Sequence, residues 1–174
     1  ERIAAQGKAA VTFKLVADEY LEKVEREGRA GVTIAKSRWL LSLLEDGIGS
    51  LPIEAITPAD LLAALKTVEK KGHLETARRM RSLAGRVFRY AVATSRAPGD
   101  PSATLRGALI APTTKHHAAL IEPKQVGGLL RAIDGFEGQP MTKLALQLAP
   151  LVYLRPGELR AAEWCDIDID AAVW

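Results

Sequence analysis

Apolar residues recur at helical spacing along the first two-thirds of the chain. Residues 13–24, 33–45 and 57–70 each carry an apolar stripe on one side, which is typical of amphipathic helices. Thr12 is a candidate cap for the first of these segments. The stripe of the second segment consists of Ile34, Trp39, Leu40, Leu43 and Leu44. Thr57, Pro58 and Asp60 form the start signal of a third helix, which Gly72 terminates.

A fourth and longer helix is predicted for residues 73–96, with two chemically distinct sides. At 100° per residue one side is apolar and consists of Met80, Leu83, Ala84, Val87 and Ala91. Arg78, Arg89 and Arg96 point almost directly away from it, and Arg79, Arg86 and Arg81 flank them. Because no acidic residue follows Glu75 in this helix, its outward half is expected to be uniformly basic.

The remaining residues predict a linker and a second, shorter unit. Residues 98–119 contain several prolines and glycines and read as a linker. Beyond it we expect helices from Pro123, over residues 141–153 with a bend near Pro150, and over residues 156–163. Residues 165–170 alternate isoleucine with aspartate, as in a strand that is beginning. The predicted fold is mainly α: a four-helix domain over residues 8–97, the linker, and a truncated α+β domain over residues 120–174.

Composition excludes several classes of protein. The hydrophobic fraction of 48% is that of a globular chain, and no apolar run approaches the roughly 20 residues needed to span a bilayer. No signal peptide is visible, and a single cysteine, Cys165, fits a reducing compartment; it is interpreted as a small packed residue. No set of Cys and His residues has metal-ligand spacing, so no zinc site is expected.

Positive charge is concentrated in one part of the chain. Residues 66–96 carry nine Lys or Arg and two Asp or Glu, a net charge of +7, whereas the whole chain carries +3. The like-charged pairs Arg78/Arg81 and Arg86/Arg89 repel each other on one helix, which phosphate groups would relieve. This block favours nucleic acid as the partner, and a solvated charged face is the alternative.

Weaker basic candidates lie outside this helix. Lys36 could reach a phosphate from the second helix, or could simply be solvated. Lys115 and His116 in the linker could contact a DNA backbone, or could belong to an exposed loop.

Arg155 follows the most apolar segment of the chain directly. Pro156 biases Arg155 towards an extended conformation and can open a helix, whose start Glu158 can reach back to cap. Because a helix start is a favourable place for an anion, Arg155 is either an anion-binding residue or an ordinary capping arginine.

Residues 144–170, LALQLAPLVYLRPGELRAAEWCDIDID, resemble the segment of tyrosine recombinases, the phage and genomic-island integrases, that carries their first catalytic arginine. The matching positions are Arg155, Gly157, Glu158, Leu159, Trp164, Asp166, Ile167 and Asp168. The stretches ITPADLLAAL and TARRMRSLAGRVFRYAV resemble the third and fourth helices of the family's SAM-like core-binding domain.

The resemblance implies integration or excision of a mobile element through a 3′-phosphotyrosyl DNA intermediate, without a cofactor. Arg155 would bind the scissile phosphate, and Glu158 would support Arg155. The implied partners are an attachment site in double-stranded DNA and, for the full-length protein, three further copies in a tetramer. A cytoplasmic, nucleoid-associated protein is expected.

The nucleophilic tyrosine and the other catalytic residues of the family lie downstream of Trp174, so this stretch alone is expected to bind DNA without recombining it. A non-enzymatic helical DNA-binding regulator and a helical interaction scaffold are the alternative interpretations.

Overall fold

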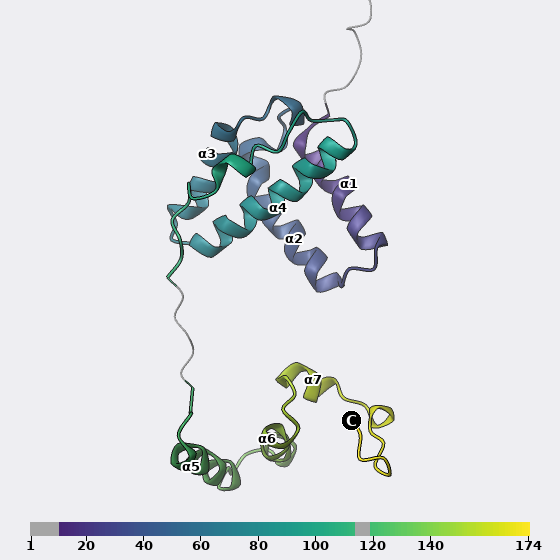
Figure 1. Ribbon diagram of the computed structural model, residues 1–174, viewed down its shortest axis with the longest axis vertical. Coiled ribbons are helices and arrows are strands. Elements are labelled where there is room, and N and C mark those ends of the chain that lie inside the picture. The colour runs from purple at the N-terminus through teal and green to yellow at the C-terminus, as the bar shows by residue number, and fades with distance from the viewer. Residues whose placement is uncertain (1–10, 114–118) are drawn as a thin grey trace, which may run out of the picture. The chain divides into compact units, whose positions relative to one another are not determined.

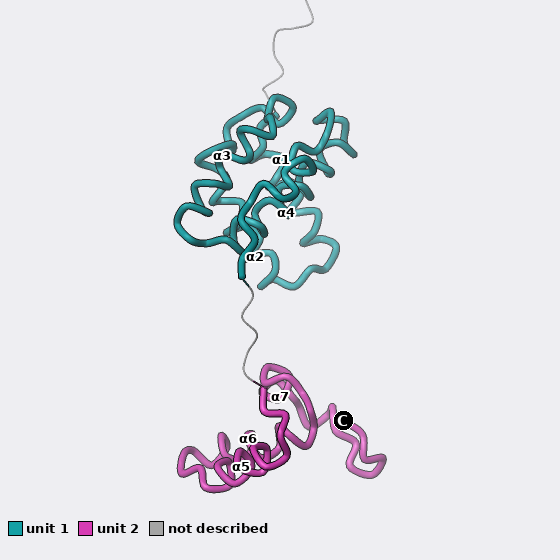
Figure 2. The backbone as a smooth tube through the Cα atoms, turned by 60° about the vertical axis from the view of Figure 1, so that its left-hand side comes forward, with its two compact units in different colours: residues 1–114 teal, residues 115–174 magenta. Residues whose placement is uncertain are grey.

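The described residues of this computed structural model, 11–113 and 119–174, belong to two compact units that divide between residues 114 and 115 (Figure 2). The first contains α1 (Phe13–Arg26), α2 (Gly31–Leu44), α3 (Pro58–Glu69) and α4 (Leu74–Ala93), with η1 (Glu45–Gly49), η2 (Ile53–Ala55) and η3 (Ala103–Leu105) (Figure 1). The second contains α5 (Pro123–Asp134), α6 (Pro140–Val152), α7 (Pro156–Ala161) and η4 (Trp164–Asp166). The mainly helical fold expected from the sequence is confirmed.

Local capping explains where the first helices begin. Thr12 Oγ1 accepts a hydrogen bond from the Leu15 amide at 3.3 Å. Thr57 and Asp60 form a reciprocal capping box, in which Asp60 Oδ2 accepts from the Thr57 amide at 2.9 Å and Thr57 Oγ1 accepts from the Asp60 amide at 3.3 Å. Both caps were predicted from the sequence and are confirmed.

α4 packs against α1, α2 and α3 in one hydrophobic core. The five residues predicted for its apolar face are all fully buried, and Ala77 and Phe88 extend that face. The rings of Phe13 and Phe88 meet at a centroid distance of 5.5 Å, which joins α1 to α4. The helical spacing of apolar residues therefore predicted the buried side of α4 correctly.

α2 departs from its predicted pattern at two positions. Trp39 was placed on the apolar stripe but is 51% exposed, whereas Leu41 is buried. The chain continues from α2 into the single π-turn η1, which brings Ile48 into the core. Because Leu41 and Ile48 share the interior with Leu40 and Leu44, the buried side of α2 is turned away from Trp39.

The segment expected to be a linker starts inside the first unit. Ser102 and Leu105 are buried, and the Ile110 amide donates to Glu69 Oε2 at the end of α3 at 2.9 Å. Residues 98–110 therefore pack on the helices and differ from the predicted linker. The Pro and Gly residues that suggested a linker form tight turns here, because Asp100 and η3 satisfy the turning backbone.

The second unit has its helices near the predicted positions but no buried residue among those described. α6 continues through Pro150 to Val152, and its apolar side chains are exposed or half-buried. Cys165 is likewise exposed and is not the packed residue that was expected.

The strand predicted after Cys165 is reduced to one antiparallel bridge. Residues Trp164–Asp166 form the 3-10 helix η4, and Asp168 pairs with Val173 through two backbone hydrogen bonds of 2.8 and 3.0 Å. In the described ranges the only other bridge joins Thr12 to Pro52. The alternating residues therefore do not continue as a strand. The chain turns tightly between Asp168 and Val173, with Ala172 in the left-handed backbone region.

Candidate nucleic-acid interface

The outward side of α4 presents a row of arginines to solvent. Arg78, Arg79, Arg86 and Arg89 are exposed, and Arg81 is half-buried. The opposite side of the same helix is fully buried, which fixes the direction of these side chains. This arrangement agrees with the two-sided pattern of the sequence.

Two of these arginines have acidic partners. Arg79 Nε donates to Glu75 Oε1 at 2.8 Å within α4, and Arg89 Nη1 donates to Asp100 Oδ2 at 2.9 Å across to the segment after the helix. Arg78, Arg81 and Arg86 form no ion pair with any residue in the described ranges. Their positive charges therefore remain available to an anion.

Lys36 of α2 belongs to the same surface. The pKa of Glu75 is held below its ordinary value, first by the hydrogen bond from Arg79 and then by the positive charges of Arg79, Arg78 and Lys36. Lys36 is exposed, and α2 packs directly against α4. Lys36 and the arginines of α4 are together called here the α2–α4 surface.

Arg96 does not belong to this surface, although the helical period placed it there. α4 ends at Ala93, and Ser95 adopts a left-handed backbone conformation with φ of 56°. The turn directs Arg96 towards α1, where Nη1 lies 2.6 Å from Glu19 Oε2 and Cζ lies 5.4 Å from the centroid of the Tyr90 ring. The prediction for Arg96 was wrong because the helix ended before that residue.

Lys115 and His116, the two linker candidates, lie outside the described residues.

Arg155 stands at the beginning of α7 in the second unit. Its backbone is extended, with φ of −66° and ψ of 146°, and Pro156 occupies the first helical position, both as predicted. Tyr153, in the left-handed region with φ of 54°, turns the chain out of α6 two residues earlier. The Arg155 side chain is 86% exposed.

Glu158 contacts both the backbone and the side chain of Arg155. Its Oε2 accepts from the Arg155 amide at 2.9 Å, and its Oε1 accepts from Arg155 Nη1 at 3.1 Å. These residues, together with Ala149, line an open hollow of about 550 Å³. Because the Arg155 side chain is 86% exposed, an anion can approach its guanidinium from solvent.

The chain matches a known domain over most of the first unit. The model of the phage integrase central domain matches residues 13–108. The chain belongs to the phage integrase family. The family match extends past α4 to include residues 98–108, in agreement with the packing of that segment on the helices.

Individual integrase relatives cover both units. Putative protein IntB of Escherichia coli K12 is 35% identical over 139 residues, which are 78% of this chain and 35% of that protein. The integrase of Enterobacteria phage P4 is 30% identical over 173 residues, which are 98% of this chain and 38% of the phage protein. The chain therefore spans somewhat more than a third of the length of these curated relatives.

Solved integrase structures share this fold. A lambda integrase dimer bound to a COC′ core site has a TM-score of 0.70 at 23% identity, over 91% of this chain and 43% of that chain. The Tn1549 transposon integrase in complex with circular intermediate DNA has a TM-score of 0.66 at 19% identity, over 89% of this chain and 51% of that chain. These structures confirm the fold, and the family match over residues 13–108 confirms the predicted membership of the phage integrases.

The described residues were also compared with what a membrane-spanning helix and a metal site require. None of their helices is long and apolar enough to cross a membrane. No group of three or more His, Cys, Asp or Glu side chains among them is placed to hold a metal ion.

The sequence interpretation missed the acidic residues that organise this integrase surface. Asp100 contacts Arg89 from eleven positions away, so no helical period relates them. The sequence Asp-Pro-Ser at residues 100–102 is a turn signal, and Asp100 Oδ1 does accept from the Ser102 amide at 2.9 Å. The turn could have been found from sequence, but the packing of the turn on α4 could not.

Proposed function

We propose that the first unit binds double-stranded DNA through the α2–α4 surface. The observation that supports this most directly is the row of arginines on α4. Arg78 and Arg86 are exposed and have no acidic partner in the described ranges, and Lys36 of α2 is exposed as well. Arginine suits phosphate because its planar guanidinium can donate two parallel hydrogen bonds.

The shape of the surface suits a groove in DNA. α4 is a 20-residue helix whose arginine-bearing side is exposed except at Gly85, and a B-DNA major groove admits an α-helix. The lambda and Tn1549 integrases that share this fold are DNA complexes. For this chain, the proposed DNA-binding residues are Arg78, Arg79, Arg81, Arg86, Arg89 and Lys36, with Lys115 and His116 as further candidates.

We further propose that the full-length protein is a site-specific tyrosine recombinase that integrates or excises a mobile element. Arg155 would bind the scissile phosphate and stabilise the charge that develops on it, and Glu158 would hold Arg155 in place. The reaction would pass through a 3′-phosphotyrosyl link in a tetramer on paired sites. These 174 residues alone would bind DNA without recombining it, because they supply one of the family's catalytic positions.

DNA binding is tested with the double variant Arg78→Ala/Arg86→Ala on duplex DNA across a salt series. Affinity should fall, and the slope of log affinity against log salt should become shallower by about 1 for each lost phosphate contact. The matched control is Lys23→Ala/Arg26→Ala, which removes the same charge from α1, where Lys23 pairs with Glu27 directly after the helix and Arg26 pairs with Glu22. Equal behaviour of the two double variants would contradict the proposed surface.

The catalytic role is tested in the full-length protein with a suicide DNA substrate. Arg155→Ala should lower formation of the covalent protein–DNA product by about 100-fold or more, with site binding retained. Arg160→Ala, an exposed arginine on α7, is the control and should cleave normally. Normal cleavage by Arg155→Ala would refute the assignment, and duplex binding by a full-length protein that never forms the covalent product would favour the non-enzymatic regulator.

A further inference from the structure

The segment of residues 98–105 contacts α4 at the one glycine of its arginine-bearing side. Gly85 is buried, and a Cβ atom there would lie 2.4 Å from Ser102 Oγ. A glycine weakens the interior of a helix, yet here only a glycine allows the segment to approach so closely. The close contact places Asp100 beside Arg89.

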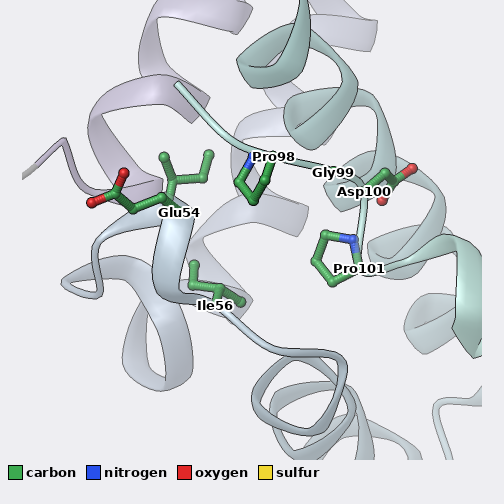
Figure 3. A pocket seen from close by; sticks show the side chains of 7 residues that line it. Glu54, Ile56, Pro98, Gly99, Asp100 and Pro101 are labelled. Atoms are coloured by element: carbon green, nitrogen blue, oxygen red, sulfur yellow. The ribbon is translucent and has the colours of Figure 1, made fainter. Parts of the chain in front are cut away.

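The carboxylate of Asp100 is fixed at both oxygens. Oδ1 accepts from the Ser102 amide at 2.9 Å, and Oδ2 accepts from Arg89 Nη1 at 2.9 Å. The Asp100 side chain is 13% exposed, whereas that of Arg89 is 62% exposed. Figure 3 shows the Pro98 and Pro101 rings towards a cavity of about 250 Å³ beside Ile56, with the Asp100 carboxylate pointing away from it. The largely buried Asp100 carboxylate therefore holds Nη1 of the exposed Arg89 guanidinium.

Arg89 is thus unlike the other arginines of the α2–α4 surface. Arg78, Arg81 and Arg86 have no ion pair in the described ranges, and Arg79 pairs with an exposed glutamate one turn away on its own helix. An exposed pair of that kind constrains a side chain little. Asp100 both neutralises part of the charge of Arg89, which weakens its attraction to phosphate, and fixes its orientation.

A fixed guanidinium is suited to reading a base. Asp100 uses one hydrogen of Nη1, so the edge formed by Nε and Nη2 keeps two parallel donors. Two parallel donors match the O6 and N7 acceptors that guanine presents in the major groove. Phosphate contacts, by contrast, fix position on the duplex without reading its sequence.

We propose that Arg89 is a specificity-determining residue that reads a guanine in the major groove, and that Asp100 is the positioning residue that orients it. This inference rests on the proposed DNA-binding function of the α2–α4 surface. It divides that surface into mobile arginines that contact phosphate and one oriented arginine that reads sequence.

The test is selection of bound duplexes from a library of random sequence, carried out with the full chain and with the variants Arg89→Lys and Asp100→Asn. The wild type should select a guanine at one position, and both variants should lose that preference by roughly tenfold or more. Arg89→Lys keeps the charge and the 98–105 segment, so it tests the proposal even if Asp100→Asn disturbs folding. The salt slope of Arg89→Lys should stay at the wild-type value.

Asp46→Asn, which makes the same charge change at an exposed residue of η1, is the control and should keep the full preference. Adding Asp100→Asn to Arg89→Lys should cause no further loss if the two residues act as one unit. Retention of the guanine preference by either single variant overturns the proposal. If the wild type binds duplexes in a salt-sensitive way but prefers no base, the role of Arg89 is overturned and the proposed DNA-binding function stands. If the wild type binds no duplex, both proposals are overturned.

Discussion

Phe88 shows most clearly how single residues stabilise the first unit. Its side chain is fully buried on the inward side of α4, and its ring meets that of Phe13 from α1. The neighbouring position on the outward side, Arg89, is exposed. One step along the helix thus separates a residue that stabilises the fold from one that is available to a partner.

We expect Phe88→Ala to lower the free energy of unfolding by about 3–5 kcal/mol, because it removes apolar contacts and leaves a cavity between α1 and α4. Urea denaturation followed by circular dichroism measures the change. Leu15→Ala, at a half-exposed position of α1, should cost far less. A loss below about 1 kcal/mol for Phe88→Ala would mean that the core collapses around the missing ring.

At the scale of elements, side-chain hydrogen bonds cap the start of α3 and join its last residue to the backbone of Ile110. Thr57 and Asp60 cap its start, and the pKa of Asp60 is lowered by the hydrogen bonds it accepts from the Thr57 hydroxyl and amide. At its last residue, Glu69 accepts from Lys66 and from the Ile110 amide. One helix therefore ties residue 110 to the four-helix core.

Replacing Thr57 with Ala should lower the free energy of unfolding by about 1 kcal/mol, since the Asp60 amide loses its acceptor and the capping box is broken. Thr57→Ser keeps the hydroxyl and should restore most of the loss. Thermal unfolding of both variants measures this difference. Equal destabilisation by Ala and Ser would show that the cap hydrogen bond is not the cause.

Glu69 should make part of the stability depend on acid pH. Its pKa is lowered by the hydrogen bond from Lys66 first and by that from the Ile110 amide second. A lowered pKa in the folded state means that the contribution of Glu69 is complete above its unfolded pKa of about 4.3 and is lost as pH falls through the folded value.

Glu69→Gln should therefore be less stable than the wild type at neutral pH, and the gap should narrow below about pH 4. Urea midpoints at several pH values measure it. A gap that stays constant on acidification would show that the ionised carboxylate is not what holds the Ile110 amide.

The two units of the molecule differ in how much of their surface is buried. The first has a continuous core from α1 to α4, to which η3 adds Leu105. Helices α5, α6 and α7 contain no buried residue, and large apolar side chains such as Leu151 and Trp164 are exposed. Burial of apolar surface is the main source of resistance to local opening.

Amide hydrogen exchange of the intact chain should reflect this difference. Amides in the middle of α3 and α4 should be protected by at least about 100-fold more than those in α5–α7. Mass spectrometry of peptides from each helix measures the rates. Equal protection in both groups would show that α5–α7 are stabilised by contacts other than those in the described residues.

Local patterns in the sequence predicted the helices of both units, the caps at Thr12 and Thr57, the two sides of α4 and the extended Arg155 before Pro156. These features depend on residues within one or two turns of each other, so period and capping chemistry reveal them. The same locality explains the errors. The helical period could not show that α4 ends before Arg96, and the turn residues of 98–110 looked like a linker.

The packing of the folded chain brings together residues that are distant in the sequence. It turns Trp39 outward and brings Asp100 beside Gly85, where Asp100 holds Arg89. The physical reason is that such contacts arise when separate helices and turns pack into one core, and no periodic signal relates positions on different elements. The sequence therefore predicted the row of arginines on α4, but it did not predict that Asp100 would fix the side chain of Arg89.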